Sequence, residues 1–397
     1  MGKLKALFIC AASLTCAVLI GTGTYAGGFL RGAVYFSAGA GEVRQTESEQ
    51  ADSSKAPSSP NISDNSYGES ASDKPDMPSD TSDISEAPET SEPLTDAPTL
   101  GRVIEINRAA SDMGVDEVDY SKYTKNSGAI ERYNFGYYND PNIITLSSGA
   151  QIRNFTDDDN AALLAASGLL PELGDFSGFE LGSDEPQVLI YHTHTSESYL
   201  PYGNSYDSDY PLRSSDNSRN ITAVGDVICE ALAERGISSV HDCTVYDYPM
   251  FTGAYYRSAE TLSELVAEYP SIKIAIDIHR DGIINSDGSV TAPIAGINGR
   301  TAAQFMIITG CDSPELDFPN YMRNFRLACL LQNCAEEAYP TLARPMLFDY
   351  RNYNQSLFDG CLLIEVGSQG NSLDEALYTG ELIGNTIADA LMRLAEQ

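Results

Sequence analysis

The pattern of apolar and polar residues divides the chain into three stretches, and the first is an uncharged apolar run. This run follows Lys3 and Lys5 and extends from residue 6 to about residue 25. Its length suits a membrane-spanning helix, which needs about 20 residues. The two lysines place the N-terminus in the cytoplasm and the rest of the chain outside it. We therefore expect a membrane anchor over residues 1–41, with a cleaved signal peptide as the alternative.

The second stretch, residues 42–100, is rich in Ser, Asp, Glu and Pro and has almost no large apolar residues. Such a segment buries too little apolar surface to offset the entropy lost on ordering. We predict a disordered acidic linker here.

The third stretch begins at residue 101, where apolar segments recur. We treat residues 101–180 as an N-terminal extension of a catalytic region. Apolar residues on both sides of Ser147-Ser148-Gly149 predict a hairpin. Thr156 is expected to cap a short helix whose first turn holds Asp157, Asp158 and Asp159.

From residue 181 to residue 397, short apolar strands alternate with amphipathic helices. The strands are expected at 188–191, 237–240, 272–278, 304–309 and 361–366, and the helices at 222–235, 257–268, 321–339 and 372–395. Ser372 and Glu375 have the spacing of a capping box. Gly288 and Asn298-Gly299 indicate turns of an inserted antiparallel piece. The alternation predicts an α/β domain with a mostly parallel, twisted sheet flanked by helices.

Composition narrows the possible functions. The chain has 24 Lys and Arg against 57 Asp and Glu, a formal net charge of −33. This balance argues against a nucleic-acid partner and against docking on anionic lipid. None of the 8 Cys forms a CxxC pair, which argues against a zinc ribbon or a thioredoxin-type site. Cys243 and Cys311 could pair, and the sequence leaves this open.

Polar residues gather at the ends of three predicted strands. His192, His194 and Glu197 follow the first strand, His279 and Arg280 end another, and Glu365 lies within the last. The chain has only 4 His, and three of them lie at two strand ends. In open α/β sheets, sites form beyond the carboxyl ends of the strands. We therefore expect these side chains to form one site.

These residue types suit a catalytic zinc ion, which binds His nitrogens and a carboxylate and keeps one position open for water. A separate carboxylate must then transfer the proton. Glu365 fits this role, because a carboxylate within an apolar run needs compensation and has a raised pKa. We assign Glu365 and Arg280 to the catalytic group. In the alternative reading, Glu365 is only the ion-pair partner of Arg280 or Arg351.

The metal ligands are chosen from His192, His194, Glu197 and His279. His192 and His194 alternate along an extended segment, so their side chains point in opposite directions and at most one meets the metal. Glu197 is either a ligand or an ordinary loop carboxylate. His241, beside Asp242, is interpreted as structural.

Four motifs resemble those of the stage II sporulation protein P family. They are VLIYHTHTSESY at 188–199, AVGD at 223–226, DIHRDG at 277–282 and LLIEVGSQGN at 362–371. The resemblance implies a fold similar to zinc-dependent N-acetylmuramoyl-L-alanine amidases, with amidase and endopeptidase activity on peptidoglycan. It also implies a single-pass protein at the sporulation septum, acting in engulfment. The implied partners are the lytic transglycosylase stage II sporulation protein D and the membrane protein stage II sporulation protein M.

The same resemblance suggests roles for single residues. His194 and His279 match the zinc-binding histidines of the broader amidase family, and Glu365 matches the catalytic glutamate. One departure concerns the third ligand, because the position of the usual zinc glutamate reads SRNI at 218–221 and has no carboxylate. We take Glu197 as its substitute, with Asp209 and Asp216 as further candidates.

Two other function classes compete with this interpretation. A non-catalytic wall-binding module would position a partner hydrolase, but it has no need of a glutamate inside an apolar strand. A metallophosphoesterase would need more His and Asp ligands than this chain offers.

Overall fold

The computed structural model of the chain describes residues 34–35, 99–108, 118–170 and 179–396. The predicted anchor and linker lie almost wholly outside these residues and stay predictions. Within the described ranges, no helix is both long enough and apolar enough to cross a membrane.

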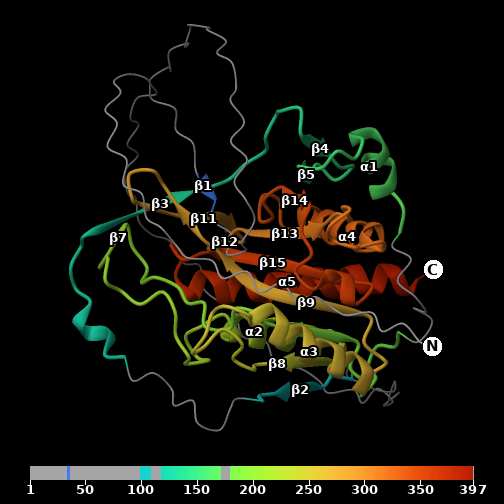
Figure 1. Cartoon of the computed structure of the whole chain (residues 1–397), viewed down its shortest axis with the longest axis horizontal. Coiled ribbons are helices and arrows are strands. Elements are labelled where there is room, and N and C mark those ends of the chain that lie inside the picture. The colour runs from blue at the N-terminus through green and yellow to red at the C-terminus, as the bar shows by residue number, and fades with distance from the viewer. Residues whose placement is uncertain (1–33, 36–98, 109–117, 171–178, 397) are drawn as a thin grey trace, which may run out of the picture.

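A nine-stranded sheet forms the centre of the molecule (Figure 1). Its strands in spatial order are β2 (Val103–Ile106), β8 (Ser239–Asp242), β6 (Val188–Tyr191), β9 (Ile274–Asp281), β15 (Cys361–Ser368), β13 (Phe305–Gly310), β14 (Met346–Asp349), β5 (Gln151–Asn154) and β4 (Ile143–Thr145). The strands from β2 to β15 are parallel to one another, and so are β13, β14 and β5. The direction reverses between β15 and β13. The sheet therefore consists of two parallel blocks that run in opposite directions, with β4 added antiparallel to β5 at one edge.

A second, six-stranded sheet lies beside the first (Figure 1). It contains β1 (Val34–Tyr35), β10 (Ile283–Ile284), β11 (Val290–Ile297), β12 (Arg300–Ala303), β3 (Gly128–Tyr133) and β7 (Ser205–Tyr206). All of its pairings are antiparallel except that of β11 with β3. The prediction of a mostly parallel sheet is therefore wrong, because the sheets are mixed. The physical reason is that hairpins lead from β9 to β13, and without a helical crossover β13 returns in the opposite direction.

Helices cover both faces of the large sheet. On one face, α2 (Thr222–Glu234), α4 (Tyr321–Ala338) and α5 (Leu373–Ala395) share a core with strand residues such as Ile276 and Ile364. On the other face, Leu262 and Leu265 of α3 (Ala254–Glu268) pack against Leu189 of β6. The short helix α1 (Asn160–Ser167) lies near β4 and α4. Two 3₁₀ turns, Tyr120–Lys122 and Gln355–Leu357, complete the described elements.

Most predicted elements are confirmed within a few residues. The hairpin of β4 and β5 is present, and the capping box of Ser372 and Glu375 forms both of its hydrogen bonds. The predicted cap Thr156 is wrong. Its hydroxyl accepts a bond from Asp158 N in a tight turn, and the side chain of Asp159 caps α1.

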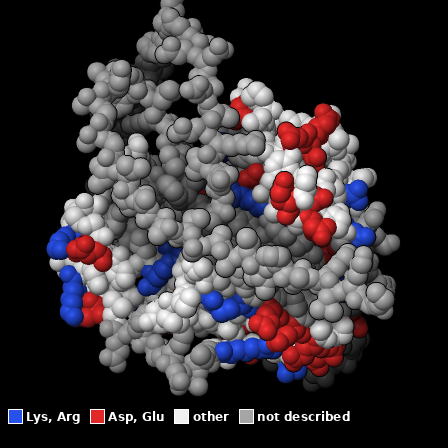
Figure 2. All heavy atoms as spheres, in the orientation of Figure 1, with Lys and Arg blue, Asp and Glu red and all other residues white. Residues whose placement is uncertain are grey.

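The described cysteines, Cys243 and Cys311 among them, are free and buried. On the face shown in Figure 2, acidic side chains gather over the regions of α1 and α3, in keeping with the acidic composition.

Candidate active site

The structure brings His194, His279 and Glu197 together, as the sequence predicts. His194 lies three residues beyond the end of β6, and His279 lies on β9, the parallel neighbour of β6. The two ring centroids are 5.2 Å apart and the rings are nearly perpendicular. Glu197 Oε2 lies 3.6 Å from His279 Nδ1. These groups meet at the carboxyl ends of two parallel strands.

Ring nitrogens in this cluster lack hydrogen-bond partners among the described residues, although they are buried. They are both nitrogens of His194. His279 Nε2 already faces Asp277 Oδ1 at 2.8 Å, so this nitrogen is taken by an ion pair. Buried polar groups usually have a partner, so unpartnered nitrogens call for one. Two imidazoles and one carboxylate are a donor set that suits zinc.

The charges around these groups also favour a bound cation. Burial lowers the pKa of His194 to about 4, so its imidazole is neutral and keeps a lone pair. Burial also lowers the pKa of His279, but the carboxylates of Asp277 and Glu197 outweigh it and raise this pKa to about 9. The site therefore attracts positive charge, which a proton or a metal ion can supply.

Glu197 is held as an anion by His279 and two arginines. Burial raises its pKa, but His279 and Arg280 outweigh this effect and lower it overall. Arg280 N donates a bond of 2.9 Å to Glu197 Oε2, and Arg213 Nη2 lies 3.7 Å from Oε1. The Arg280 guanidinium itself donates to the carbonyls of Ser198 and Leu212. This arrangement fixes the loop that carries Glu197.

The wall over His194 was not predicted from the sequence. The Phe251 ring stacks on His194 with centroids 4.4 Å apart, and the Arg213 guanidinium lies 4.7 Å from the Phe251 centroid. Asp247 accepts bonds from Ser196 N and Arg213 Nη1 and lies 3.9 Å from His194 Nδ1. Asp247 and Phe251 lie on the loop between β8 and α3, which has no periodic pattern, so no sequence signal marked them.

Glu365 lies directly beside the cluster. It is the register partner of His279 on β9 and of Met306 on β13, at the point where the sheet changes direction. Its side chain is 7% exposed, and Oε2 has no hydrogen-bond partner among the described residues. Burial, together with the nearby Asp281 carboxylate, raises the pKa of Glu365 to about 8. A carboxyl group with this pKa is suited to exchanging protons near neutral pH.

The other proposed ligands are engaged elsewhere. Asp209 pairs with Lys125, and Asp216 accepts bonds from Ser218. His192 uses both ring nitrogens: Nδ1 lies 3.0 Å from Ile278 O, and Nε2 lies 2.9 Å from His241 Nε2.

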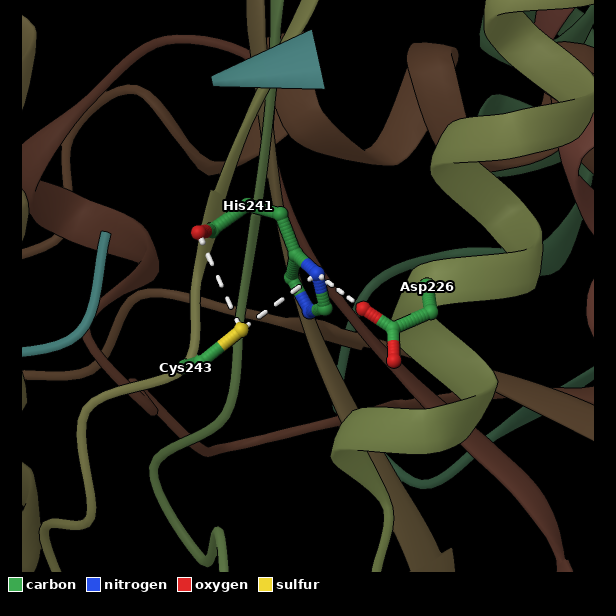
Figure 3. Close-up of side chains that lie close together, drawn as sticks. All are labelled: Asp226, His241 and Cys243. Atoms are coloured by element: carbon green, nitrogen blue, oxygen red, sulfur yellow. Dashed lines mark hydrogen bonds and ion pairs between the residues drawn. The ribbon is translucent and has the colours of Figure 1, made fainter. Parts of the chain in front are cut away.

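His241 belongs to a second group of possible ligands, with Asp226 on α2 and Cys243 after β8 (Figure 3). His241 Nδ1 lies 3.0 Å from Asp226 Oδ1 and 3.5 Å from Cys243 Sγ. The ligand atoms of this group all lie within 4.8 Å of one another. By distance alone, this second group is the tighter one.

The hydrogen bonds of His192 and His241 show whether the second group has nitrogens free to bind a metal ion. A carbonyl only accepts, so His192 Nδ1 carries a hydrogen. Burial lowers the pKa of His192 to about 3, so this ring is neutral and its Nε2 accepts from His241 Nε2. His241 Nδ1 then faces Asp226 Oδ1 at 3.0 Å, so each nitrogen of the two rings already has a neighbour within bonding distance and none of them calls for a metal ion.

The comparisons with known proteins agree with the motifs. The family model described as Stage II sporulation protein P (SpoIIP) matches residues 34–388, which is most of the chain. The chain belongs to the stage II sporulation protein P family. The predicted resemblance is thereby confirmed.

A curated relative, stage II sporulation protein P of Bacillus subtilis (strain 168), is 30% identical over 204 residues. The match covers 48% of each protein, so the chain spans about half the length of that relative.

Two solved structures show distant similarity. The amidase AmiC2 of Nostoc punctiforme has 13% identity and a TM-score of 0.33, with 54% of this chain and 99% of that one covered. The CwlD amidase of Clostridioides difficile, in complex with the GerS lipoprotein, has 14% identity and a TM-score of 0.31, with 52% and 94% covered. Similarity at this level adds nothing to the argument about function.

Proposed function

We propose that the chain is a zinc-dependent peptidoglycan hydrolase with N-acetylmuramoyl-L-alanine amidase and endopeptidase activity. The observation that carries this proposal is the buried cluster of His194, Glu197 and His279 with unpartnered nitrogens next to Glu365. Membership of a sporulation protein family supports a role in remodelling the wall during sporulation.

In this proposal, His194, His279 and Glu197 hold the metal. A zinc ion in such a site polarises a carbonyl and lowers the pKa of water. Asp277 faces Nε2 of His279 and fixes the orientation of the ring, the usual role of a carboxylate behind a ligating histidine. Phe251 covers His194 and keeps bulk water from it.

Glu365 moves the proton. In its ionised form, Oε2 would accept a proton from the attacking water and then donate it to the amine that leaves, which makes the amine a neutral leaving group. Its position beside His279, at a strand spacing of about 4.8 Å, puts it within reach of the reacting atoms.

Arg280 acts as a positioning residue. Its backbone N–H binds Glu197, and its guanidinium holds the carbonyls of residues 198 and 212. We infer that the predicted catalytic contribution of Arg280 consists of keeping Glu197 in place.

The test combines metal analysis with digestion of purified sacculi. We expect stoichiometric zinc, release of stem peptides from the glycan, and loss of both with a chelator. Zinc-free protein that still releases peptides would show that the activity does not require the metal. Zinc-loaded protein that binds sacculi without releasing peptides would favour the wall-binding module.

The membrane anchor, the septal location and the partners also belong to this proposal. A charge-free run after Lys3 and Lys5 supports an uncleaved anchor with the catalytic domain outside the cytoplasm. Fractionation should find the full-length chain in the membrane, and co-purification from sporulating cells should recover stage II sporulation proteins D and M. A soluble form that starts near Gly27 or Gly41 would show that the segment is cleaved.

A further inference from the structure

One face of the large sheet carries a continuous row of side chains that starts at the candidate active site. The strand registers place His279 of β9 beside Glu365 of β15, and Glu365 beside Met306 of β13. Two residues further along β13, Ile308 is the partner of Leu347 on β14. Leu347 in turn is the partner of Arg153 on β5. Register partners and residues two apart point to the same face, so the row runs across the strands.

A cavity of about 210 Å³ lies over this row. Its apolar floor is formed by Met306, Ile308 and Leu347, and Phe135 and Tyr138 form an aromatic wall. Glu365 lines it at the end nearest the cluster. The cavity is therefore continuous with the place where the reaction is proposed.

Arg344 lines this cavity and is 3% exposed. Its Nη1 donates a bond of 2.9 Å to Asp281 Oδ2. Its Nε and Nη2 are buried and have no hydrogen-bond partner among the described residues. A buried guanidinium with unused donors destabilises the protein unless an acceptor arrives. A carboxylate matches the planar geometry of a guanidinium better than any other common group.

A second arginine lines the far end of the cavity. The Arg153 guanidinium lies 5.1 Å from the centroid of Tyr138 and 5.6 Å from that of Phe155. Arg351, which also lines the cavity, is paired with Asp349. Asp281 and Asp349 line the cavity as the partners of Arg344 and Arg351. What stays available is the pair of unused donors on Arg344 and the guanidinium of Arg153.

We propose that this cavity binds an extended acidic peptide, with Arg344 receiving a carboxylate of the peptide and Arg153 stabilising the negative charge at its far end. The proposal rests on the proposed function, because it names the part of the substrate that the site selects. Three strand spacings and a step of two residues along β13 separate Glu365 from Arg153, about 16 Å, which an extended chain of about four to five residues covers. The site then selects the peptide side of the cleaved bond.

The test measures binding and does not depend on turnover. The full chain carrying Glu365→Gln is titrated with a tetrapeptide that has two free carboxylates, and with the same peptide amidated at both. We expect the acidic peptide to bind more tightly by about tenfold to a hundredfold, as hydrogen bonds to charged groups allow. Arg344→Lys keeps the charge but loses the planar pair of donors, and it should remove most of this preference.

Two further variants complete the experiment. Arg153→Gln lies on β5 and should weaken binding of the acidic peptide by roughly threefold to tenfold, so the idea stays testable if Arg344→Lys does not fold. Arg323→Lys, on α4 and paired with Asp359, is the matched control and should change nothing. The proposal would be overturned if the parent protein bound the acidic and the amidated peptide with equal affinity. It would also be overturned if Arg344→Lys and Arg153→Gln weakened the binding of the two peptides to the same extent.

The outcome separates the two proposals. Stem-peptide release by the wild-type chain without a carboxylate preference would remove the inference alone. If the acidic peptide binds more tightly in a manner that depends on Arg344, but the wild-type chain releases no stem peptides, the hydrolase proposal is refuted and the protein is a binder of acidic peptides.

Discussion

Two groups of imidazoles lie close together in this protein, and they differ in what their nitrogens touch. The first contains His194 and His279, and both nitrogens of His194 lack a hydrogen-bond partner among the described residues. The second contains His192 and His241, whose nitrogens lie within about 3 Å of one another, of Ile278 O and of Asp226. The short distances between ligand atoms favour the second group as a metal site, whereas the nitrogens without hydrogen-bond partners favour the first. The comparison teaches that open lone pairs indicate a binding site better than proximity does.

The largest effect is expected from removing the first group. In the double variant His194→Ala, His279→Ala, zinc content should fall to background. Turnover should fall by more than about 10⁴, because the metal and its chemistry are both lost. Metal analysis and sacculus digestion check this, with a melting curve to show that the fold persists. Stoichiometric zinc in the double variant would mean that the second group, and not the first, binds the metal.

A control separates the two histidines that follow β6. His192→Ala should leave zinc in place, since both nitrogens of His192 already have neighbours within bonding distance. Loss of zinc from this variant alone would exchange the roles of His192 and His194.

The next largest effect concerns Glu365. Glu365→Gln keeps the shape of the side chain and removes the basic oxygen, so turnover should fall by about 10² to 10⁴. Zinc and sacculus binding should persist, because Glu365 holds neither. Release of stem peptides is the measurement, and wild-type turnover in a folded variant would remove Glu365 from the mechanism.

The same substitution has a pH-dependent effect on the metal-free protein. The pKa of Glu365 is raised from 4.5 to about 8, so the folded state keeps its proton between these values while the unfolded state has lost it. The free energy of unfolding should therefore decrease from pH 4.5 to pH 8 in the wild type, by at most roughly 5 kcal/mol from this group. Glu365→Gln should lack this loss. Urea unfolding of both proteins at pH 5 and pH 8 measures the difference, and parallel curves would contradict it.

Asp277→Asn should have a moderate effect that is confined to the first group. It removes the charge behind His279, and the affinity for zinc should fall by about tenfold to a hundredfold, as is typical of partners of ligating histidines. Competition with a chelator of known affinity gives the value. An unchanged affinity would mean that Asp277 only holds Thr193, from which it accepts two bonds.

The smallest effect is expected in the second group. Asp226 has a side chain that is 52% exposed, so Asp226→Asn should lower the free energy of unfolding by about 1 kcal/mol or less. Zinc content and turnover should stay at wild-type values in this variant and in Cys243→Ser. Loss of zinc from either would show that the second group binds the metal.

Much of the fold could be predicted from the sequence, but the strand directions could not. Periodicity and capping residues are local, so the strand at 188–191 and the capping box of Ser372 are visible in the sequence. Direction depends on how the chain returns to the sheet. The reversal between β15 and β13 therefore became clear only in the structure.

The candidate site, too, could be predicted from the sequence only in part. His194, His279 and Glu365 could be found because they stand at or near the ends of apolar strands. Arg344 was missed, although it lies in the apolar run 342–348 and carries the same signal that marked Glu365. Phe251 and Asp247 come from a loop without a pattern, and the contact between His192 and His241 joins residues 49 positions apart. Such contacts depend on tertiary packing.

The close approach of α2 to the second group has a consequence for which sequences this fold tolerates. A Cβ atom added at Gly225 would lie 2.3 Å from His241 Nε2 and 2.6 Å from His192 Nε2. Two buried rings that bond to each other cannot both move away from a new methyl group. In a saturation mutagenesis library selected for folded protein, position 225 should therefore return glycine almost alone, although glycine has no side chain to contribute to a site.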